Sequence, residues 1–329
     1  MRGQAPKALR WPRLESRYKA HKTCVNDLLG ILRHHNLDFH CVNRVELDRQ
    51  HLANVDLVLA VGGDGTVLSA AHFLDHGTIP LLGINSDPIK EEDRDTKKIS
   101  DERRSHGALC ACRSDNMAEE LEKILHGDGQ IQERTRIQCI VKSTFSETKL
   151  VPALNDILIA NPSPAAVSRF RMGWMVPVDT GNHGPLKDGY FGSSFEERAT
   201  TQYSHYGTVT RFGGIAYDIK NSLNVWSSGM WLSTATGSTA AMAAAGGMPM
   251  DLKSTDLQYL IREHIFESNE VKGRDNGWVK RGEQLHLRWN SQKGTIFIDG
   301  SHMTHDMELG DEILINPNAP PLQLFVPSN

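Results

Sequence analysis

Two patterns of apolar residues divide the chain near residue 130. Before that point, apolar runs at 55–61 and 79–85 alternate with segments of helical period at 16–35, 67–76 and 117–126. A continuous apolar run that ends in glycine is typical of a buried parallel strand. Strands that alternate with helices predict an α/β domain whose parallel sheet is doubly wound. The apolar face of the first helix would consist of Tyr18, Val25, Leu28, Leu29 and Leu32.

After residue 130 the pattern changes to short strands separated by turns, which predicts a β-rich second domain. The predicted strands are Ile131–Val141, Leu154–Ala160, Leu285–Trp289, Thr295–Ile298 and Glu312–Ile315. We therefore expect an α/β domain over residues 1–128, a β-rich domain over 129–316 and a C-terminal tail over 317–329.

Two segments fit neither pattern. Nearly every residue from Lys90 to Arg104 is charged, with both signs mixed, and we interpret this stretch as a solvated loop rather than a binding surface. Residues 173–208 mix glycine, proline, aromatic and hydroxyl residues with few aliphatic ones. A stretch of this length is either a functional lid or disordered, and we favour a disordered or loosely packed insertion.

The first candidate site lies where an apolar strand meets its helix, at Gly62-Gly63-Asp64-Gly65-Thr66. Open α/β sheets bind ligands at the carboxyl ends of their strands. Glycines there let backbone N–H groups approach a phosphate, and the helix dipole favours its charge. We expect Thr66 to cap the helix and Asp64 to accept or orient a hydroxyl proton in phosphoryl transfer. The alternative is an ordinary turn with Asp64 as a cap.

Polar residues also stand at the ends of other predicted strands. Asn85 ends the second strand, where a ligand of the sheet would lie. Asn155-Asp156 precedes an apolar strand; the pair could bind ribose hydroxyls or an amide of a nucleotide, or simply cap the strand. The loop Thr234–Thr239 precedes a helix of small residues and could form a second anion or sugar site. It does not match the Gly-x-Ser-x-Gly elbow of serine nucleophiles.

Other spacings predict structural roles and no metal site. His72 and His76 lie four residues apart, but no third ligand stands at a matching spacing. We expect these two side chains, and those of His302 and His305, to face solvent. Asp299-Gly300 follows a strand and is interpreted as a hairpin turn.

Composition excludes several classes of protein. The chain has 329 residues, of which 39% are hydrophobic and 23% charged, as in ordinary soluble proteins. A net charge of −4 argues against nonspecific nucleic-acid binding, and no apolar run reaches membrane-spanning length. The five cysteines form no CxxC pair and fit a reducing compartment.

We expect a cytoplasmic homodimer or larger homo-oligomer that binds small-molecule nucleotides and neither membrane nor nucleic acid. An organellar location is the alternative, because residues 1–22 carry seven Lys/Arg and one acidic residue, as the remnant of a targeting segment would. The residues 326–329 are no peroxisomal signal.

Five stretches occur in the order typical of the NAD kinase family, which this sequence resembles over residues 50–315. They are Gly62–Thr66, Gly83–Asn85, Asn155-Asp156, Thr234–Thr239 and Asp299-Gly300. Three more resemble the plant NADH kinase branch: Asn85–Pro88, Pro162–Phe170 and Gly237–Met242.

The resemblance implies an α/β domain joined to a β-sandwich domain that binds NAD(H), with the site between them. It implies transfer of the ATP γ-phosphate to the 2′-hydroxyl of the adenosine ribose of NADH or NAD, with NADH the expected preference. Asp64 would be the proton acceptor or would orient the hydroxyl, and Mg²⁺ would be held mainly by the phosphates of ATP. The remaining site residues implied are Gly63, Gly65 and Thr66 for phosphates, and Asn85, Asn155, Asp156, Thr236, Gly237, Ser238 and Thr239 for the dinucleotide.

The chain departs from the commoner NAD kinases at two positions. Ser228-Gly229 stands where they have Asp-Gly, and Ala241 stands where they have tyrosine. Both changes enlarge or neutralise the implied site, and both recur in the plant branch. Two other functions share part of the pattern. A lipid kinase of the diacylglycerol or sphingosine type shares Gly-Gly-Asp-Gly-Thr but lacks the Thr-Gly-Ser-Thr loop, and a non-catalytic nucleotide-binding regulator would bind without phosphoryl transfer.

Overall fold

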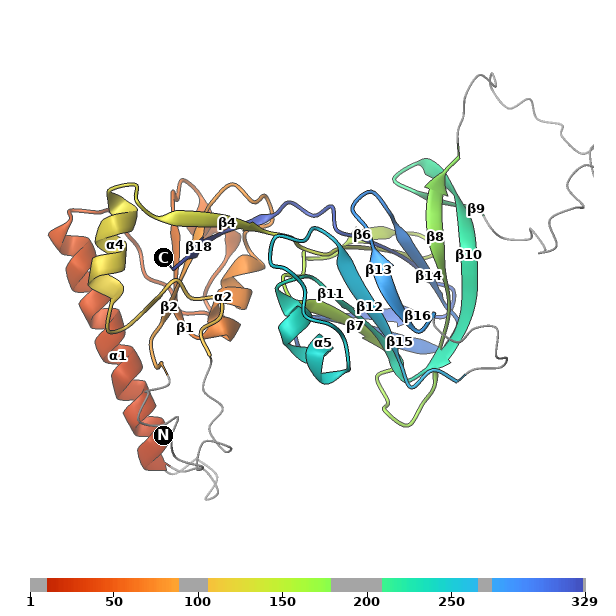
Figure 1. Cartoon of the computed structure of the whole chain (residues 1–329), viewed down its shortest axis with the longest axis horizontal. Coiled ribbons are helices and arrows are strands. Elements are labelled where there is room, and N and C mark those ends of the chain that lie inside the picture. Colours follow the sequence, from red (N-terminus) through yellow and green to blue (C-terminus); the bar gives the residue numbers. More distant parts are fainter. Residues whose placement is uncertain (1–10, 89–105, 179–208, 266–273, 328–329) are drawn as a thin grey trace, which may run out of the picture.

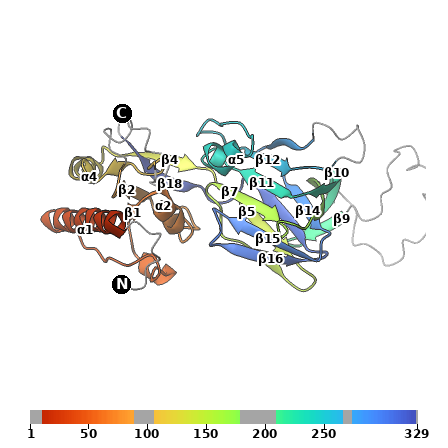
Figure 2. The same cartoon turned by 90° about the horizontal axis from the view of Figure 1, so that it is seen from below.

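The computed structural model describes residues 11–88, 106–178, 209–265 and 274–327. They form an N-terminal α/β domain and a larger β-rich domain, which lie side by side in Figures 1 and 2. The charged segment 90–104 lies outside the described residues. Of the predicted insertion 173–208, the first residues belong to a strand that ends at Pro177, and residues 179–208 lie outside the described part.

A five-stranded sheet organises the N-terminal domain. Its strands are β1 (Val58–Gly62), β2 (Leu81–Asn85), β3 (Cys112–Arg113), β4 (Gln130–Arg134) and β18 (Leu322–Val326). The strand order is β1-β2-β18-β4, with β3 also paired to β2. Strands β1, β3 and β18 run parallel to β2, and only β4 is antiparallel to its neighbour. The predicted parallel strands are therefore confirmed.

Helices cover both faces of this sheet. They are α1 (Trp11–His34), α2 (Asp64–Ala71) and α4 (Met117–Leu125), with a short 3-10 helix η2 (Arg49–Leu52). Leu81 packs in the apolar cluster of α2, whereas the next residue, Leu82, packs in the cluster of α1 and α4. This alternation confirms the doubly wound arrangement. No helix among the described residues is both long and apolar enough to cross a membrane.

The first helix differs from its prediction in two details. It begins at Trp11 rather than Ser16, so Pro12 falls in the first turn, where a missing N–H is tolerated. Tyr18 is 65% exposed, and Cys24, 2% exposed, is buried instead. The predicted apolar face was therefore wrong at its N-terminal end.

Two antiparallel sheets make up the β-rich domain. The first contains β5 (Gln138–Lys142), β6 (Glu147–Lys149), β8 (Ser168–Pro177), β9 (Val209–Phe212), β10 (Ile215–Ser227), β14 (Leu285–Trp289) and β17 (Glu312–Asn316). The second contains β7 (Asp156–Ala160), β11 (Gly229–Ser233), β12 (Leu257–Arg262), β13 (Asn276–Val279), β15 (Lys293–Ile298) and β16 (Thr304–Glu308). Their orders are β6-β5-β17-β14-β8-β10-β9 and β13-β12-β11-β7-β15-β16.

One apolar core joins these two sheets. Phe170 and Trp289, whose stacked rings lie 6.0 Å apart, contribute from the first sheet, and Ile157 and Leu232 contribute from the second. Because both inner faces supply fully buried side chains, the domain is a β-sandwich. The fold expected from the sequence is confirmed.

The chain crosses between the domains twice, and here the structure differs from the expected boundaries. The predicted strand Ile131–Val141 is split into β4, in the N-terminal sheet, and β5, in the sandwich. The expected tail 317–329 instead contributes β18 to the N-terminal sheet. The physical reason is burial: Leu322 and Leu324 are 0% and 1% exposed and belong to the core around α2.

A half-buried cluster of polar and charged side chains links β9, the edge strand of the seven-stranded sheet, to β17, β14 and β5 of the same sheet. Glu312 accepts hydrogen bonds from the Thr210 hydroxyl and from His286 Nε2, the latter at 3.1 Å, and lies 3.7 Å from Lys142 Nζ. Burial alone would raise the pKa of Glu312, but the hydrogen bonds from His286 and Thr210 and the charges of His286 and Lys142 lower it to about 2. The ionised carboxylate therefore stabilises the fold.

We predict that Glu312→Gln weakens the pH dependence of stability in acid. Because the folded pKa lies below the usual value of 4.5, the stabilisation is complete above that pH and is lost as pH falls towards 2. The wild-type protein should lose about 2 kcal/mol more unfolding free energy than the variant between pH 6 and pH 3. Urea unfolding at both pH values measures this, with the exposed Glu308→Gln as control. Equal losses in wild type and Glu312→Gln would contradict the prediction.

Candidate functional site

The glycine turn joins β1 directly to α2. Gly63 is the N-cap of the helix and Asp64 is its first residue, so the prediction that Thr66 caps the helix was wrong. Thr66 lies in the first turn, where its N–H donates to the Gly63 carbonyl at 2.8 Å. A Cβ atom on Gly62 would lie 2.2 Å from Thr66 Oγ1, whereas one on Gly65 would meet open space. The turn is therefore closed on the Gly62 side and open to a ligand at Gly65.

Backbone groups fix the orientation of the Asp64 carboxylate. Oδ1 accepts a hydrogen bond from the Leu109 N–H at 2.8 Å, and Oδ2 accepts one from the Gly107 N–H at 3.1 Å. Both carboxylate oxygens are therefore held by backbone groups of the loop 106–109. Whether Asp64 accepts the proton or orients the hydroxyl stays a prediction.

The loop 106–109, which the sequence analysis missed, closes over the end of β2. Gly107 has a φ of +72°, and a Cβ atom there would lie 2.6 Å from Asn85 Nδ2. Asn85 is 4% exposed, and its Oδ1 accepts from the Asp87 N–H at 3.2 Å. The only sequence signal for this contact was a lone glycine after a charged segment, which does not identify a partner.

The two predicted stretches of the β-rich domain touch each other. Thr234 donates its hydroxyl to the Leu154 carbonyl at 2.6 Å, and its N–H to the Asn155 carbonyl at 2.9 Å. Gly237 lies so close that a Cβ atom would be 2.1 Å from the Asn155 oxygen. The structure thus brings Asn155-Asp156 and the hydroxyl-rich loop into one group, as expected if both bind one ligand.

The residues of this group differ in how far their side chains are exposed to solvent. Asn155 and Thr236 are half-buried and Thr239, at the end of the short 3-10 helix η4 (Gly237–Thr239), is exposed. Ser238 is fully buried; its hydroxyl donates to the Ala235 carbonyl at 2.8 Å and accepts from the Met250 N–H at 2.9 Å. Ser238 therefore holds the loop in shape, while the other three can reach a ligand.

Asp156 has an unusual electrostatic environment. The residue is 6% exposed, and burial, together with the nearby charge of Asp299, raises its pKa to about 7. The carboxyl group of Asp156 therefore changes its protonation state near neutral pH. It can accept a hydroxyl proton when ionised and donate when protonated.

Asp299 links this group to α2. Its carboxylate accepts the three consecutive N–H groups of Leu154, Asn155 and Asp156, at 2.9, 2.7 and 3.1 Å. His72 Nε2 donates a fourth hydrogen bond at 2.8 Å. The Asp299-Gly300 turn was correctly placed between two strands, but its carboxylate also joins the two domains.

The histidine prediction was therefore wrong for His72. Its side chain is buried because it follows α2 into the domain junction. His76 and His302 are exposed, as expected, and His305 is half-buried. No cluster of three His, Cys, Asp or Glu side chains in the described ranges could hold a metal ion.

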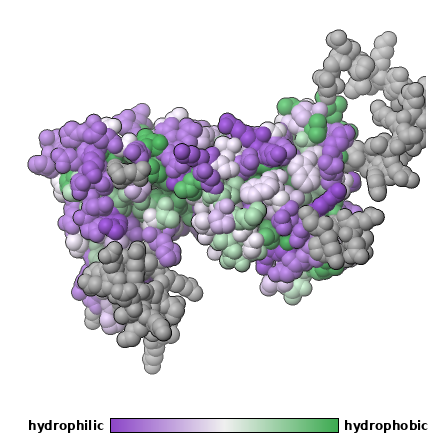
Figure 3. Space-filling view, in the orientation of Figure 1, coloured by the Kyte–Doolittle hydropathy of each residue, from purple (hydrophilic) through white to green (hydrophobic). Residues whose placement is uncertain are grey.

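Helix α2 runs from the glycine turn to the group formed by Asn155-Asp156 and the loop Thr234–Thr239. Eight residues of α-helix are about 12 Å long, with Asp64 at the start and His72, bound to Asp299, just past the end. Leu154 packs in the same cluster as Val67 and Leu68 of the helix. Figures 1 and 2 show α2 on the side of the N-terminal domain that faces the sandwich, and Figure 3 shows the visible surface indented where the domains meet.

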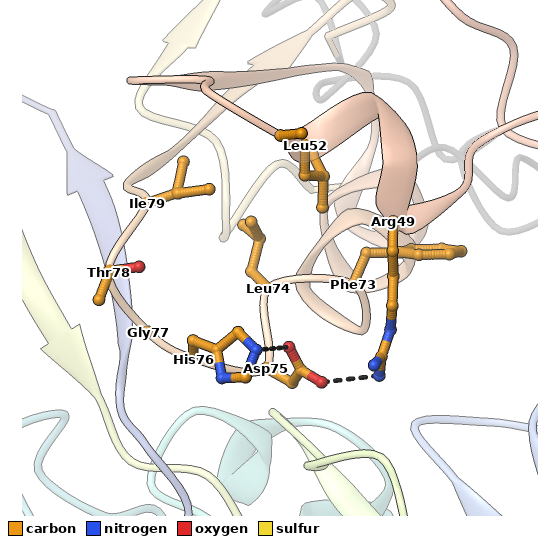
Figure 4. Close-up of a pocket in the computed structure, with 10 residues that line it drawn as sticks. Arg49, Leu52, Phe73, Leu74, Asp75, His76, Gly77, Thr78 and Ile79 are labelled. Carbon is orange, nitrogen blue, oxygen red and sulfur yellow. Dashed lines mark ion pairs between the residues drawn. The ribbon is translucent and has the colours of Figure 1, made fainter.

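A separate hollow lies beyond the C-terminal end of α2 (Figure 4). It is lined by η2 and by the segment from Phe73 to Ile79, and Asp75 there pairs with Arg49 at 2.6 Å and with His76 at 3.5 Å. None of the predicted site residues lines it. The candidate site is therefore the glycine turn and the Asn155-Asp156 group, not this hollow.

Comparison with known proteins shows similarity to one protein family and to plant relatives over nearly the whole of this chain. Residues 12–87 match the family model of the ATP-NAD kinase N-terminal domain. The chain is 35% identical over 332 residues to a probable NADH kinase of Oryza sativa subsp. japonica, covering 100% of this chain and 88% of that relative. It is 36% identical over 316 residues to an NADH kinase of Arabidopsis thaliana, covering 95% and 86%.

Two solved structures share the fold. Yeast NADH kinase complexed with NADH superposes with a TM-score of 0.60 at 16% identity, over 86% of this chain and 65% of that one. An NAD kinase from Archaeoglobus fulgidus in complex with ATP gives a TM-score of 0.59 at 18% identity, over 92% and 88%. These identities show the fold, whereas the two plant relatives show the family. The chain belongs to the NAD kinase family.

Proposed function

We propose that this protein transfers the γ-phosphate of ATP to the 2′-hydroxyl of the adenosine ribose of NADH or NAD. One observation carries the proposal. The Asp64 carboxylate, fixed by two backbone N–H groups at an open glycine turn, begins the helix whose far end is bound, through Asp299, to Asn155 and Asp156. The names of the two plant relatives, a probable NADH kinase and an NADH kinase, support the same activity.

Phosphates of the nucleotides would bind at the start of α2. The first N–H groups of a helix lack partners within it, and its dipole favours an anion there. Gly63 is the N-cap, Gly65 leaves open space and Thr66 contributes to the same turn. Asp64 would hold the 2′-hydroxyl in line with the γ-phosphate, because phosphoryl transfer depends mostly on positioning and charge stabilisation.

Residues of both domains would hold the dinucleotide. Asn155 and Asp156 offer amide and carboxyl groups to sugar hydroxyls, and Thr236 and Thr239 lie on the loop packed against them. Asn85 would act through the loop 106–109 that it supports. Mg²⁺ would arrive with ATP and be held mainly by its phosphates.

We further propose that NADH is the preferred acceptor. Ala241, the first residue of the short helix α5 (Ala241–Ala244), is half-buried beside the hydroxyl-rich loop and leaves more room than the tyrosine of commoner NAD kinases would. Ser228, the second departure, donates its hydroxyl to Glu263. A coupled assay with NADH and NAD as rival acceptors tests this preference, and a higher kcat/KM for NAD would contradict it.

We predict that Asp64→Asn lowers kcat by about 10³-fold while the protein remains folded. The amide keeps one acceptor oxygen, but its NH₂ group cannot accept from Gly107 or Leu109, so the side chain loses its position. No side-chain hydrogen bond caps α2, so the helix should persist. NADPH formation from NADH and ATP measures the activity, and circular dichroism with urea unfolding measures the fold. Normal turnover would remove Asp64 from the reaction.

The exposed Asp27→Asn is the matched control and should keep wild-type activity. The same assay separates the rival functions. A lipid kinase would phosphorylate diacylglycerol or sphingosine in vesicles and leave NADH unchanged. A non-catalytic regulator would bind ATP or NADH in calorimetry without forming NADPH.

We predict that Asp156→Asn raises KM for the dinucleotide about tenfold or more, the effect of losing a hydrogen bond to a charged group. Because burial raises the pKa of Asp156 to about 7, the ionised fraction of this carboxyl grows between pH 6 and pH 8. A sugar hydroxyl donates best to the ionised form, so the wild-type KM should fall over this range.

In Asp156→Asn this fall in KM should disappear. Steady-state kinetics at fixed saturating ATP, at pH 6, 7 and 8, measures the effect, with the exposed Asp128→Asn as control. The hypothesis fails if both variants keep the pH dependence of the wild type.

A further inference from the structure

A fully buried arginine, Arg136, stands where the chain first crosses between the domains. It follows β4 of the N-terminal sheet and precedes β5 of the sandwich, and its side chain is 0% exposed. Nε donates to the Pro320 carbonyl at 2.7 Å, and Nη1 donates to the Ala71 carbonyl at 3.3 Å. The two carbonyl groups belong to segments that are far apart in the sequence, and the Arg136 side chain donates a hydrogen bond to each.

Each of the two carbonyl groups lies at a junction of the fold. Pro320 belongs to the second crossing, between β17 and β18. Ala71 is the last residue of α2, the helix that begins with Asp64. Gly77, just beyond α2, packs so closely on this crossing that a Cβ atom there would be 2.4 Å from the Pro321 oxygen. Arg136 therefore connects both crossings to the C-terminal end of α2.

The stability of the fold does not by itself explain why the charged Arg136 side chain is buried here. Burial lowers the pKa of Arg136 to about 10, against the opposing effect of Asp75 and Asp299, so the group stays charged at neutral pH. Its Nη2 has no hydrogen-bond acceptor among the described residues. Buried charged groups can often be replaced by apolar ones without loss of stability. A cation at a helix C-terminus interacts favourably with the helix dipole, and the Nη1 hydrogen bond attaches Arg136 to that end of α2.

We propose that Arg136 is a positioning residue that fixes α2, and with it Asp64, relative to the sandwich domain. Two contacts hold the C-terminal end of the helix: Arg136 donates to the Ala71 carbonyl, and His72, the next residue, donates to Asp299. An eight-residue helix moves as a rigid rod, so a shift at its C-terminal end is transmitted to Asp64. A misplacement of about 1 Å can reduce the rate of such a reaction about 10²-fold.

Two substitutions and a matched control test the kinetic side, which rests on the proposed kinase activity. Arg136→Met removes the charge and both hydrogen bonds but keeps much of the volume, and Arg136→Lys restores the charge. Arg134→Met is the control, because Arg134 is also buried, at 4% exposed, yet it makes no hydrogen bond to α2 among the described residues. All assays are run at a temperature at which urea unfolding shows each variant to be folded.

Arg136→Met should lower kcat about 10²-fold while both KM values stay within about threefold, since binding groups remain and their alignment is lost. Arg136→Lys should recover most of kcat, and Arg134→Met should keep it. A purely structural role would instead lower the stability of both Met variants and leave kcat of the folded protein unchanged, which would overturn the proposal.

A distance measurement tests the positioning without any assay of activity. Cys41 is exposed in the N-terminal domain, and the other four cysteines, Cys24, Cys110, Cys112 and Cys139, are buried. Phe145→Cys, at a 98% exposed position between β5 and β6, supplies a second spin-label site in the sandwich. Pulsed electron paramagnetic resonance on the doubly labelled full chain then gives the distance distribution between the domains.

Arg136→Met should broaden or shift this distribution, whereas Arg134→Met should reproduce the wild-type one. An unchanged distribution in Arg136→Met would overturn the proposal. If the wild-type protein phosphorylates neither NADH nor NAD, the proposed function fails, and the distance distribution still decides whether Arg136 orients the domains.

Discussion

Four hydrogen-bond donors converge on the carboxylate of Asp299, and the rest of the site depends on this arrangement. Three are the consecutive N–H groups of Leu154, Asn155 and Asp156, and the fourth is His72 Nε2. A buried carboxylate without such donors would cost several kcal/mol, of the order known for buried ions. With them, the start of β7 and the end of α2 are held at one point. This side chain therefore ties together the two halves of the candidate site, which lie on different domains.

The same carboxylate shapes the electrostatics around it. Asp156 lies close enough to Asp299 that the nearby negative charge adds to the effect of burial in raising the pKa of Asp156. Asp156 therefore changes its protonation near neutral pH. The structural link at Asp299 and the protonation of Asp156 are thus coupled.

The double crossing of the chain gives this junction its rigidity. Strands β4 and β18 complete the N-terminal sheet although the segments next to them build the sandwich. Leu322 and Leu324 are buried in the core around α2, where Leu154 of the sandwich also packs. Because one apolar cluster contains residues of both domains, relative motion of the domains would expose apolar surface. Polar contacts of Arg136 and Asp299 then select one arrangement within that cluster.

The sequence by itself determined the local features: the parallel strands, the glycine turn that presents Asp64, and the ordered stretches that identify the family. These depend on residue types and short-range periodicity, which a single chain displays directly. The tertiary structure alone decided which partners those residues have. Asp64 bonds to residues 43 and 45 positions away and His72 to one 227 positions away. The tertiary structure also buried Ser238, placed β18 in the N-terminal sheet and made Arg136 a link between the two crossings and α2. Periodicity in the sequence predicts which side chains are exposed, but it does not predict which distant segments pack together.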